Sequence, residues 1–125
     1  MLIDDRPKLQ VYMMKRSSKT VFGGMWVFPG GTVDADDSFD VYETHCRKSD
    51  QEASTRLELE TGGLAYYVAA IREAFEESGI LLANMGQTDE PLAMTTTHDK
   101  TRFHDYRGAV HSGKLPLSQI IESNE

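Results

Sequence analysis

The stretch Arg72-Glu73-Ala74-Phe75-Glu76-Glu77-Ser78-Gly79-Ile80 decides the fold, because it has the pattern of the end of an amphipathic helix. Apolar side chains recur at helical spacing along it and just before it, forming one stripe: Leu64, Tyr67, Val68, Ile71, Ala74 and Phe75. Glu73, Glu76 and Glu77 fall on the opposite side of the helix. Gly79 is a typical helix stop, so we expect these carboxylates in the last turns.

Three carboxylates at this end of a helix repel one another and the negative end of the helix dipole. The dipole disfavours each by roughly 0.3–1 kcal/mol, and Glu73 and Glu77, at i and i+4, repel each other by a few tenths more. A divalent cation reverses the sign of these interactions, and clustered oxygen ligands suit Mg²⁺ or Mn²⁺. The alternative is a solvated acidic face without a ligand, although such a helix ordinarily carries Lys or Arg in its final turn.

Two strand-like segments precede this helix. Leu9 to Met14 has the composition of a strand, and a second apolar run ends at Phe28-Pro29-Gly30-Gly31, where proline and a glycine turn are typical of a strand end. Lys15 and Arg16 directly follow the first segment, where their positive charges can meet the phosphates of a ligand. An ordinary solvated loop is the alternative for this basic pair.

Together these segments resemble the Nudix box, G-x5-E-x7-R-E-U-x-E-E-x-G-U, in which U is a bulky aliphatic residue. Arg72 to Ile80 matches its second half, and Phe28 to Gly31 matches the strand end and the glycine that open it. Ala74 is smaller than the usual U residue, and Asp37 stands where the family has Glu. In addition, 34 residues lie between Asp37 and Arg72 where the motif has seven, so about 27 residues are inserted.

A box divided in this way is similar to that of the coenzyme A diphosphatase-like Nudix hydrolases, whose eukaryotic members are peroxisomal. The run from Val11 to Gly31 also resembles the signature before the box in coenzyme A-directed members. The resemblance implies a metal-dependent hydrolase of a diphosphate linkage in a small nucleoside diphosphate derivative, with coenzyme A or an acyl-CoA as first candidate. An inactive Nudix-like binding module, a non-functional fragment and a plain helical interaction domain are the alternatives.

The resemblance also implies roles for individual residues. Glu73, Glu76 and Glu77 correspond to the metal-binding glutamates, and the carbonyl of Gly31 approaches the same Mg²⁺ or Mn²⁺ ion. One of these glutamates, or a carboxylate outside the box, serves as general base. Arg72 orients the glutamates through charge-assisted hydrogen bonds rather than by touching substrate.

The implied fold is α/β: a single Nudix-like α/β/α sandwich around a mixed sheet, spanning residues 1–125. The polar segment at about 38–63 predicts a solvated helical insertion. It contains a short helix near 50–60, which starts at a capping box of Ser49 and Glu52 and stops at Gly62-Gly63. Further helices are predicted at about 99–112 and after Pro116. Because nothing after Leu82 has strand character, we expect a partial domain whose sheet is incomplete, with an unpaired edge that allows self-association.

Composition excludes several other classes of protein. With 125 residues, the chain suffices for one small domain, and its net charge of −7 argues against nonspecific binding to nucleic acid or anionic membranes. No apolar run approaches the ~18 residues of a membrane span, and the lone Cys46 excludes an internal disulfide. We expect a cytoplasmic protein, or a peroxisomal one if its parent is eukaryotic. The four histidines are predicted to be surface residues: His45, His98, His104 and His111.

Overall fold

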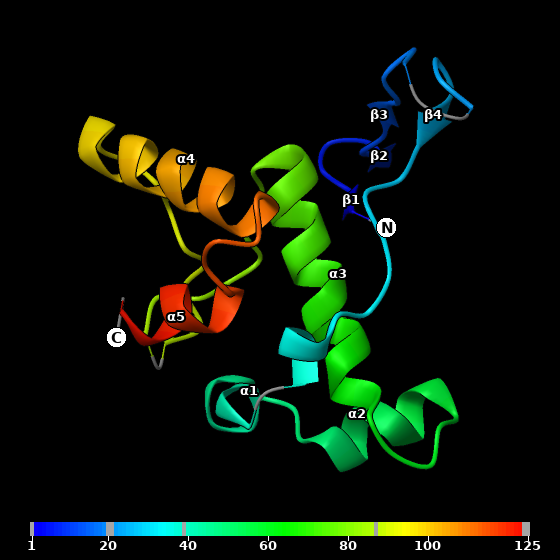
Figure 1. Ribbon diagram of the computed structural model, residues 1–125, viewed down its shortest axis with the longest axis vertical. Helices are drawn as coiled ribbons and strands as arrows, with labels where there is room; N and C mark the ends of the chain where they lie inside the picture. Colours follow the sequence, from blue (N-terminus) through cyan, green and yellow to red (C-terminus); the bar gives the residue numbers. More distant parts are fainter. Residues whose placement is uncertain (1, 20–21, 39, 87, 124–125) are drawn as a thin grey trace.

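The computed structural model describes residues 2–19, 22–38, 40–86 and 88–123, and its core is formed by helices. Helix α3 (Gly63–Ser78) runs through the middle of the molecule (Figure 1). Helix α2 (Asp50–Leu57) packs beside its start, and α4 (Thr97–His111) lies against its end. The remaining helical segments are the 3-10 helix η1 (Ala35–Ser38), α1 (Val41–His45) and α5 (Leu117–Glu122).

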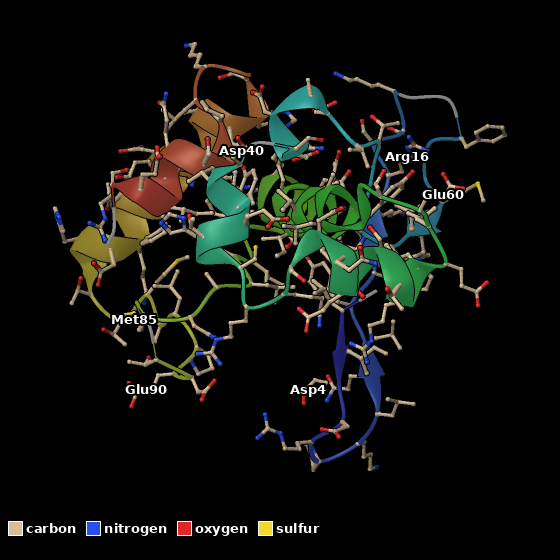
Figure 2. The ribbon with its side chains drawn as sticks, turned by 90° about the horizontal axis from the view of Figure 1, so that it is seen from below. Asp4, Arg16, Asp40, Glu60, Met85 and Glu90 are labelled. Carbon is tan, nitrogen blue, oxygen red and sulfur yellow. The ribbon has the colours of Figure 1, made fainter. Side chains whose placement is uncertain are left out.

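The strands form two small antiparallel sheets rather than one mixed sheet within the described residues. Strand β1 (Ile3–Asp4) pairs with β2 (Gln10–Val11), and β3 (Met14–Lys15) pairs with β4 (Trp26–Val27). The strand predicted over Leu9–Met14 is therefore divided between the two sheets. The hairpin that carries Asp4 projects away from the helices (Figure 2). The α/β class is confirmed, but the described strands do not build the central sheet of an α/β/α sandwich.

The predicted box helix forms as expected. Val68 and Phe75, on its apolar stripe, are almost fully buried, and the stripe packs against apolar side chains of α4 and α5: Phe103, Val110, Leu117 and Ile120. Gly79 ends the helix with a φ of 78°, which favours glycine, and its N–H donates to the carbonyl of Phe75 at 2.8 Å. The helix is thus fixed by the core on one side and presents its carboxylates on the other.

Most described residues of the segment at 38–63 are exposed, but the segment is not wholly solvated as its polar composition predicts. Tyr42 and Ala53 belong to the core. The carboxylate of Asp50 accepts hydrogen bonds from the N–H groups of Leu64 and Gly62, each at 2.9 Å. Polar side chains of α2 therefore cap the start of α3, where the first N–H groups of a helix lack partners.

The two glycines at the end of this segment begin a helix instead of stopping one. Helix α2 ends at Leu57, and Glu58 takes the left-handed conformation that terminates it. Gly62 is the N-cap residue of α3, and Gly63 donates its N–H to Ser54 Oγ at 2.8 Å. A Cβ atom at Gly63 would collide with the backbone of Ser54, so this glycine permits α2 and α3 to pack closely.

Local signals elsewhere are confirmed. The predicted capping box of Ser49 and Glu52 is present. The helix predicted at 99–112 is α4, and the short helix after Pro116 is α5. After Leu82, the described residues pair only at an isolated bridge between Asn84 and Pro91. None of the helices in the described ranges has the length and apolar character needed to cross a membrane.

Candidate functional site

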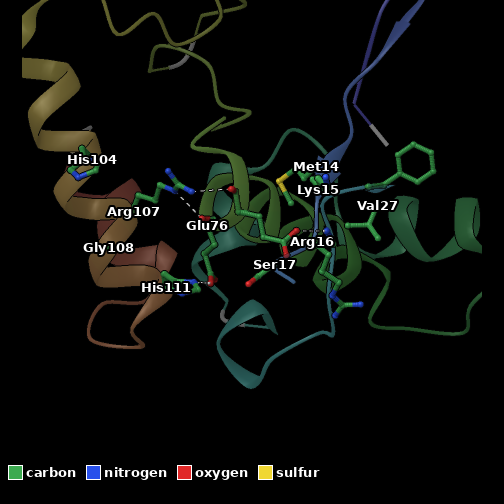
Figure 3. A pocket seen from close by; sticks show the side chains of 13 residues that line it. Met14, Lys15, Arg16, Ser17, Val27, Glu76, His104, Arg107, Gly108 and His111 are labelled. Carbon is green, nitrogen blue, oxygen red and sulfur yellow. Dashed lines mark hydrogen bonds and ion pairs between the residues drawn. The ribbon is translucent and has the colours of Figure 1, made fainter. Parts of the chain in front are cut away.

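A cavity of about 560 Å³ lies beside the last turn of α3, between the β3–β4 hairpin and α4 (Figure 3). Its charged and titratable lining residues come from three elements: Lys15 and Arg16 from the hairpin, Glu76 and Glu77 from α3, and His104, Arg107 and His111 from α4. The structure therefore brings the predicted basic pair and two of the three predicted glutamates into one cavity.

The β3–β4 hairpin determines where the basic pair lies. Lys15 is paired with Trp26 across the two strands. Arg16 donates its N–H to the carbonyl of Met25 and accepts from the N–H of Gly24, both at 2.9 Å. These backbone bonds fix the hairpin, and both cationic residues line the same cavity as the acidic end of α3. Their predicted contact with substrate phosphates stays a prediction.

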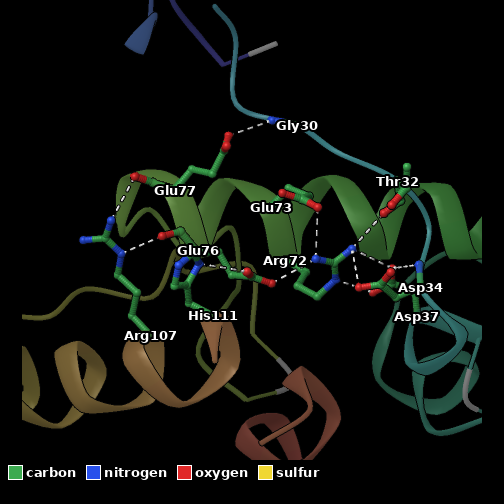
Figure 4. A network of polar contacts seen from close by, with 10 residues as sticks. All are labelled: Gly30, Thr32, Asp34, Asp37, Arg72, Glu73, Glu76, Glu77, Arg107 and His111. Atoms are coloured by element: carbon green, nitrogen blue, oxygen red, sulfur yellow. Dashed lines mark hydrogen bonds and ion pairs between the residues drawn. The ribbon is translucent and has the colours of Figure 1, made fainter. Parts of the chain in front are cut away.

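Arg72, one turn before the cavity-lining Glu76 on α3, is the centre of a polar network (Figure 4). Its Nε and Nη2 atoms donate to the two carboxylate oxygens of Asp37, at 2.9 and 3.0 Å. Its Nη1 atom donates to Glu73 Oε1 at 3.1 Å and to Glu76 Oε1 at 2.9 Å. The hydrogen bonds with Asp37 raise the pKa of Arg72 above its already high value, although burial opposes this. The orienting role of Arg72 stays a prediction.

Asp37, which the sequence indicated only as a weaker candidate site residue, is the main partner of Arg72. It occupies the Glu position of the motif, but the insertion begins directly after it, so the spacing to Arg72 concealed the pair. The 3-10 helix η1 places its side chain beside Arg72, where Asp37 is only 1% exposed. Its second oxygen also accepts the N–H of Asp34 at 2.8 Å. The Arg72–Asp37 pair joins the two halves of the divided box.

The glutamates differ in environment. The side chains of Glu73 and Glu76 are only 16% and 13% exposed, whereas Glu77 is exposed and accepts the N–H of Gly30 at 3.0 Å. Burial raises the pKa of Glu73, and the charges of the other two glutamates add to this, while Arg72 opposes it. A fully solvated acidic face therefore does not describe Glu73 and Glu76.

The site's chemistry fits a divalent cation, whereas its side-chain positions do not yet form a coordination shell. A Cβ atom at Gly31 would collide with Glu73 Oε1, so glycine lets the backbone after β4 pass close to this carboxylate. Carboxylate and carbonyl oxygens are the donors that Mg²⁺ and Mn²⁺ prefer. Within the described ranges, however, no three His, Cys, Asp or Glu side chains are placed to hold a metal ion. Glu73 and Glu76 are directed to Arg72 instead.

Helix α4 supplies site residues that sequence reasoning missed. Arg107 donates from Nε and Nη2 to the carbonyls of Glu76 and Glu77, at 2.8 and 2.9 Å. His111 Nδ1 lies 3.4 Å from Glu76 Oε2. The exposure expected of His104 and His111 is confirmed, but both line the cavity. The available signal was their spacing, since residues 104, 107, 108 and 111 fall on one face of the predicted helix.

Comparisons with known proteins identify the family to which this chain belongs. The NUDIX domain matches residues 1–118. The acyl-coenzyme A diphosphatase NUDT19 of Xenopus laevis is 31% identical over an alignment length of 139, and the match covers 90% of this chain and 37% of that protein. The chain thus spans little more than a third of the length of this curated relative. No solved structure matches the chain. These findings confirm the resemblance seen in the divided box: the chain belongs to the NUDIX domain family.

Proposed function

We propose that this chain provides the catalytic site of a Mg²⁺- or Mn²⁺-dependent diphosphatase for a small nucleoside diphosphate derivative. One observation carries the proposal: a single cavity joins the acidic end of α3, with Glu76 and Glu77, to the cationic pair Lys15 and Arg16. The first candidate substrate is coenzyme A or an acyl-CoA, which the printed name of the Xenopus laevis relative supports.

In this proposal, the acidic residues hold the cation and the basic pair binds the substrate. Glu73, Glu76 and Glu77, with the Gly31 carbonyl, would hold the cation, which when bound polarises phosphorus and lowers the pKa of a water molecule. Lys15 and Arg16 bind substrate phosphates at the facing wall. A net charge of −7 repels anionic substrates at long range, so this local positive charge is needed for binding.

The activity is tested by incubating the chain with Mg²⁺ and coenzyme A and separating the products by chromatography. We expect release of a phosphorylated adenosine fragment with Mg²⁺ but not with excess chelator. ADP-ribose and NADH are assayed in parallel, and preferential cleavage of either would contradict the choice of substrate while retaining the reaction class.

The metal assignment has its own measurement. Titration with Mn²⁺ by calorimetry compares the unmodified chain with Glu77→Gln and with the matched control Glu60→Gln, which changes an exposed glutamate before α3. We expect weaker binding for Glu77→Gln and unchanged binding for the control. Equal Mn²⁺ affinity in all three proteins would contradict the assignment of the glutamates as ligands.

A second candidate is a Nudix-like module that binds such molecules without turnover. The observation that favours it is the engagement of Glu73 and Glu76 by Arg72, since both carboxylates must leave Nη1 or share it before they hold a cation. A calorimetric titration with coenzyme A beside the product assay separates the candidates: binding of coenzyme A without any product would select the module. Cytoplasmic or peroxisomal location and self-association through a strand edge stay predictions.

A further inference from the structure

We propose that Arg107 of α4 is a positioning residue, which holds the last turn of α3 and thereby Glu76 and Glu77. The inference rests on the proposed function, because it assigns Arg107 a purpose in the site where those glutamates act. Arg107 lies outside the Nudix box in sequence, on a helix that the resemblance to the box does not include.

The hydrogen bonds at the end of α3 support this role directly. The last carbonyls of any α-helix lack N–H partners within that helix. At the end of α3, the carbonyl of Phe75 accepts from Gly79, and the next two carbonyls accept from Arg107. One guanidinium therefore supplies partners for the backbone of both residues whose carboxylates line the cavity (Figure 4).

The charge of Arg107 also suits this place. Helix α3 has no basic residue in its last turn, although that turn carries two glutamates and the negative end of the helix dipole. Arg107 supplies a positive charge there from a helix about thirty residues further along the chain. The sequence of α3 itself thus lacks a cation at the end of the helix, and the packing of α4 supplies one, Arg107.

The shape of the guanidinium matters as well as its charge. Nε and Nη2 lie on one edge of the planar group and donate to two successive carbonyls at 2.8 and 2.9 Å, which a lysine ammonium cannot reproduce with the same rigidity. One turn further along α4, His111 lies beside the carboxylate of Glu76. Helix α4 therefore contacts both the backbone and the side chain of this glutamate, and groups that orient ligands in this way govern metal affinity.

The test compares Arg107→Gln and Arg107→Lys with Lys100→Gln, which changes an exposed cation on the same helix. In the metal-free chain, hydrogen exchange reports directly on the end of α3. We expect faster exchange of the Ser78 and Gly79 amides in both Arg107 variants, with the Val68 amide unchanged. In a Mn²⁺ titration, we expect about tenfold or greater loss of affinity for Arg107→Gln and a smaller loss for Arg107→Lys. The control should match the unmodified chain in both measurements.

The outcomes separate this inference from the proposed function. If the unmodified chain neither binds Mn²⁺ nor cleaves coenzyme A, the proposed function fails, and unchanged exchange at Ser78 and Gly79 would then also remove the positioning role. If the unmodified chain binds Mn²⁺ and Arg107→Gln binds it equally well, the inference is overturned, whether or not thermal stability falls. If Arg107→Gln does not fold, the same criteria apply to Arg107→Lys.

Discussion

Arg72 connects three segments through one guanidinium: its donors reach Asp37 in η1, the carbonyl of Thr32 in the preceding loop, and Glu73 and Glu76 in its own helix. Its side chain is only 9% exposed, so solvent cannot replace a lost partner. A lysine keeps the positive charge but lacks the planar fork that spans both oxygens of Asp37. The geometry of the group, and not its charge alone, is therefore expected to hold the divided box together.

We predict that Arg72→Lys lowers the free energy of unfolding by about 2–3 kcal/mol, because at least one charged hydrogen bond of the buried Asp37 carboxylate is lost. Urea unfolding of the metal-free chain measures this change. Arg6→Lys, at an exposed arginine whose nearby acidic partner is also exposed, is the matched control and should change little. Equal effects of the two substitutions would show that Arg72 contributes only as a charge.

At the scale of single residues, the sequence identified the residues of the site more readily than the residues with which they form hydrogen bonds. Arg72 and the three glutamates stand out because they are consecutive and periodic on one helix. Asp37 was only a weaker candidate and Arg107 was not found, because each reaches its partners across 30 residues or more. A hydrogen bond between distant segments leaves no spacing pattern in a single sequence, so the pairing of Asp37 with Arg72 and the contacts of Arg107 required the structure.

Among the elements, the polar composition was misleading at the joint between α2 and α3, where polar side chains of α2 cap the start of α3. These polar side chains do not face solvent alone, because Asp50 and Ser54 accept hydrogen bonds from the first N–H groups of α3. Capping boxes and glycine stops are short-range signals and were predicted correctly at Ser49 and Gly79. The capping of one helix by side chains of another is not local, so the same sequence also fitted a solvated insertion.

We predict that Asp50→Asn destabilises the chain at neutral pH and that the loss disappears in acid. Hydrogen bonds from the N–H groups of Leu64 and Gly62 lower the pKa of the Asp50 carboxyl. A group whose pKa is lower in the folded state stabilises that state above its unfolded pKa of about 4, and this contribution is lost as pH falls through the folded value. Thermal unfolding between pH 7 and pH 2.5 measures the difference.

The control for this series is Asp40→Asn, since the side chain of Asp40 forms no capping hydrogen bond at the start of α1. Its melting temperature should follow that of the unmodified chain at each pH. A constant difference between Asp50→Asn and the unmodified chain down to pH 2.5 would mean that ionisation of Asp50 does not stabilise the joint.

At the scale of the whole molecule, the hydrophobic core lies in the helical part of the chain. The cationic wall of the cavity, formed by Lys15 and Arg16, lies in the strand-bearing part that precedes it. The core consists of side chains between Tyr42 and Ile120. Among the described residues that precede η1, none is buried, and large apolar side chains such as Leu9 and Trp26 are 72% and 63% exposed. Lys15, in β3, and Arg16, directly after it, thus belong to a hairpin with little apolar burial, whereas the glutamates of the cavity belong to a helix of the core.

We predict that the two hairpins open independently of the helical core. Local opening free energies range from near zero to the full stability of a domain, and segments with few buried apolar contacts lie at the low end. Hydrogen exchange should therefore be on the order of 100-fold faster for the hydrogen-bonded amides of Tyr12 and Arg16 than for that of Ala69 in α3. Saturating coenzyme A with Mg²⁺ should slow the Arg16 amide, since phosphates bound there favour the closed hairpin, and leave Ala69 almost unchanged. Equal protection of Arg16 and Ala69 without ligand would show that the hairpins unfold only with the core, so that the cationic wall is as rigid as the helix it faces.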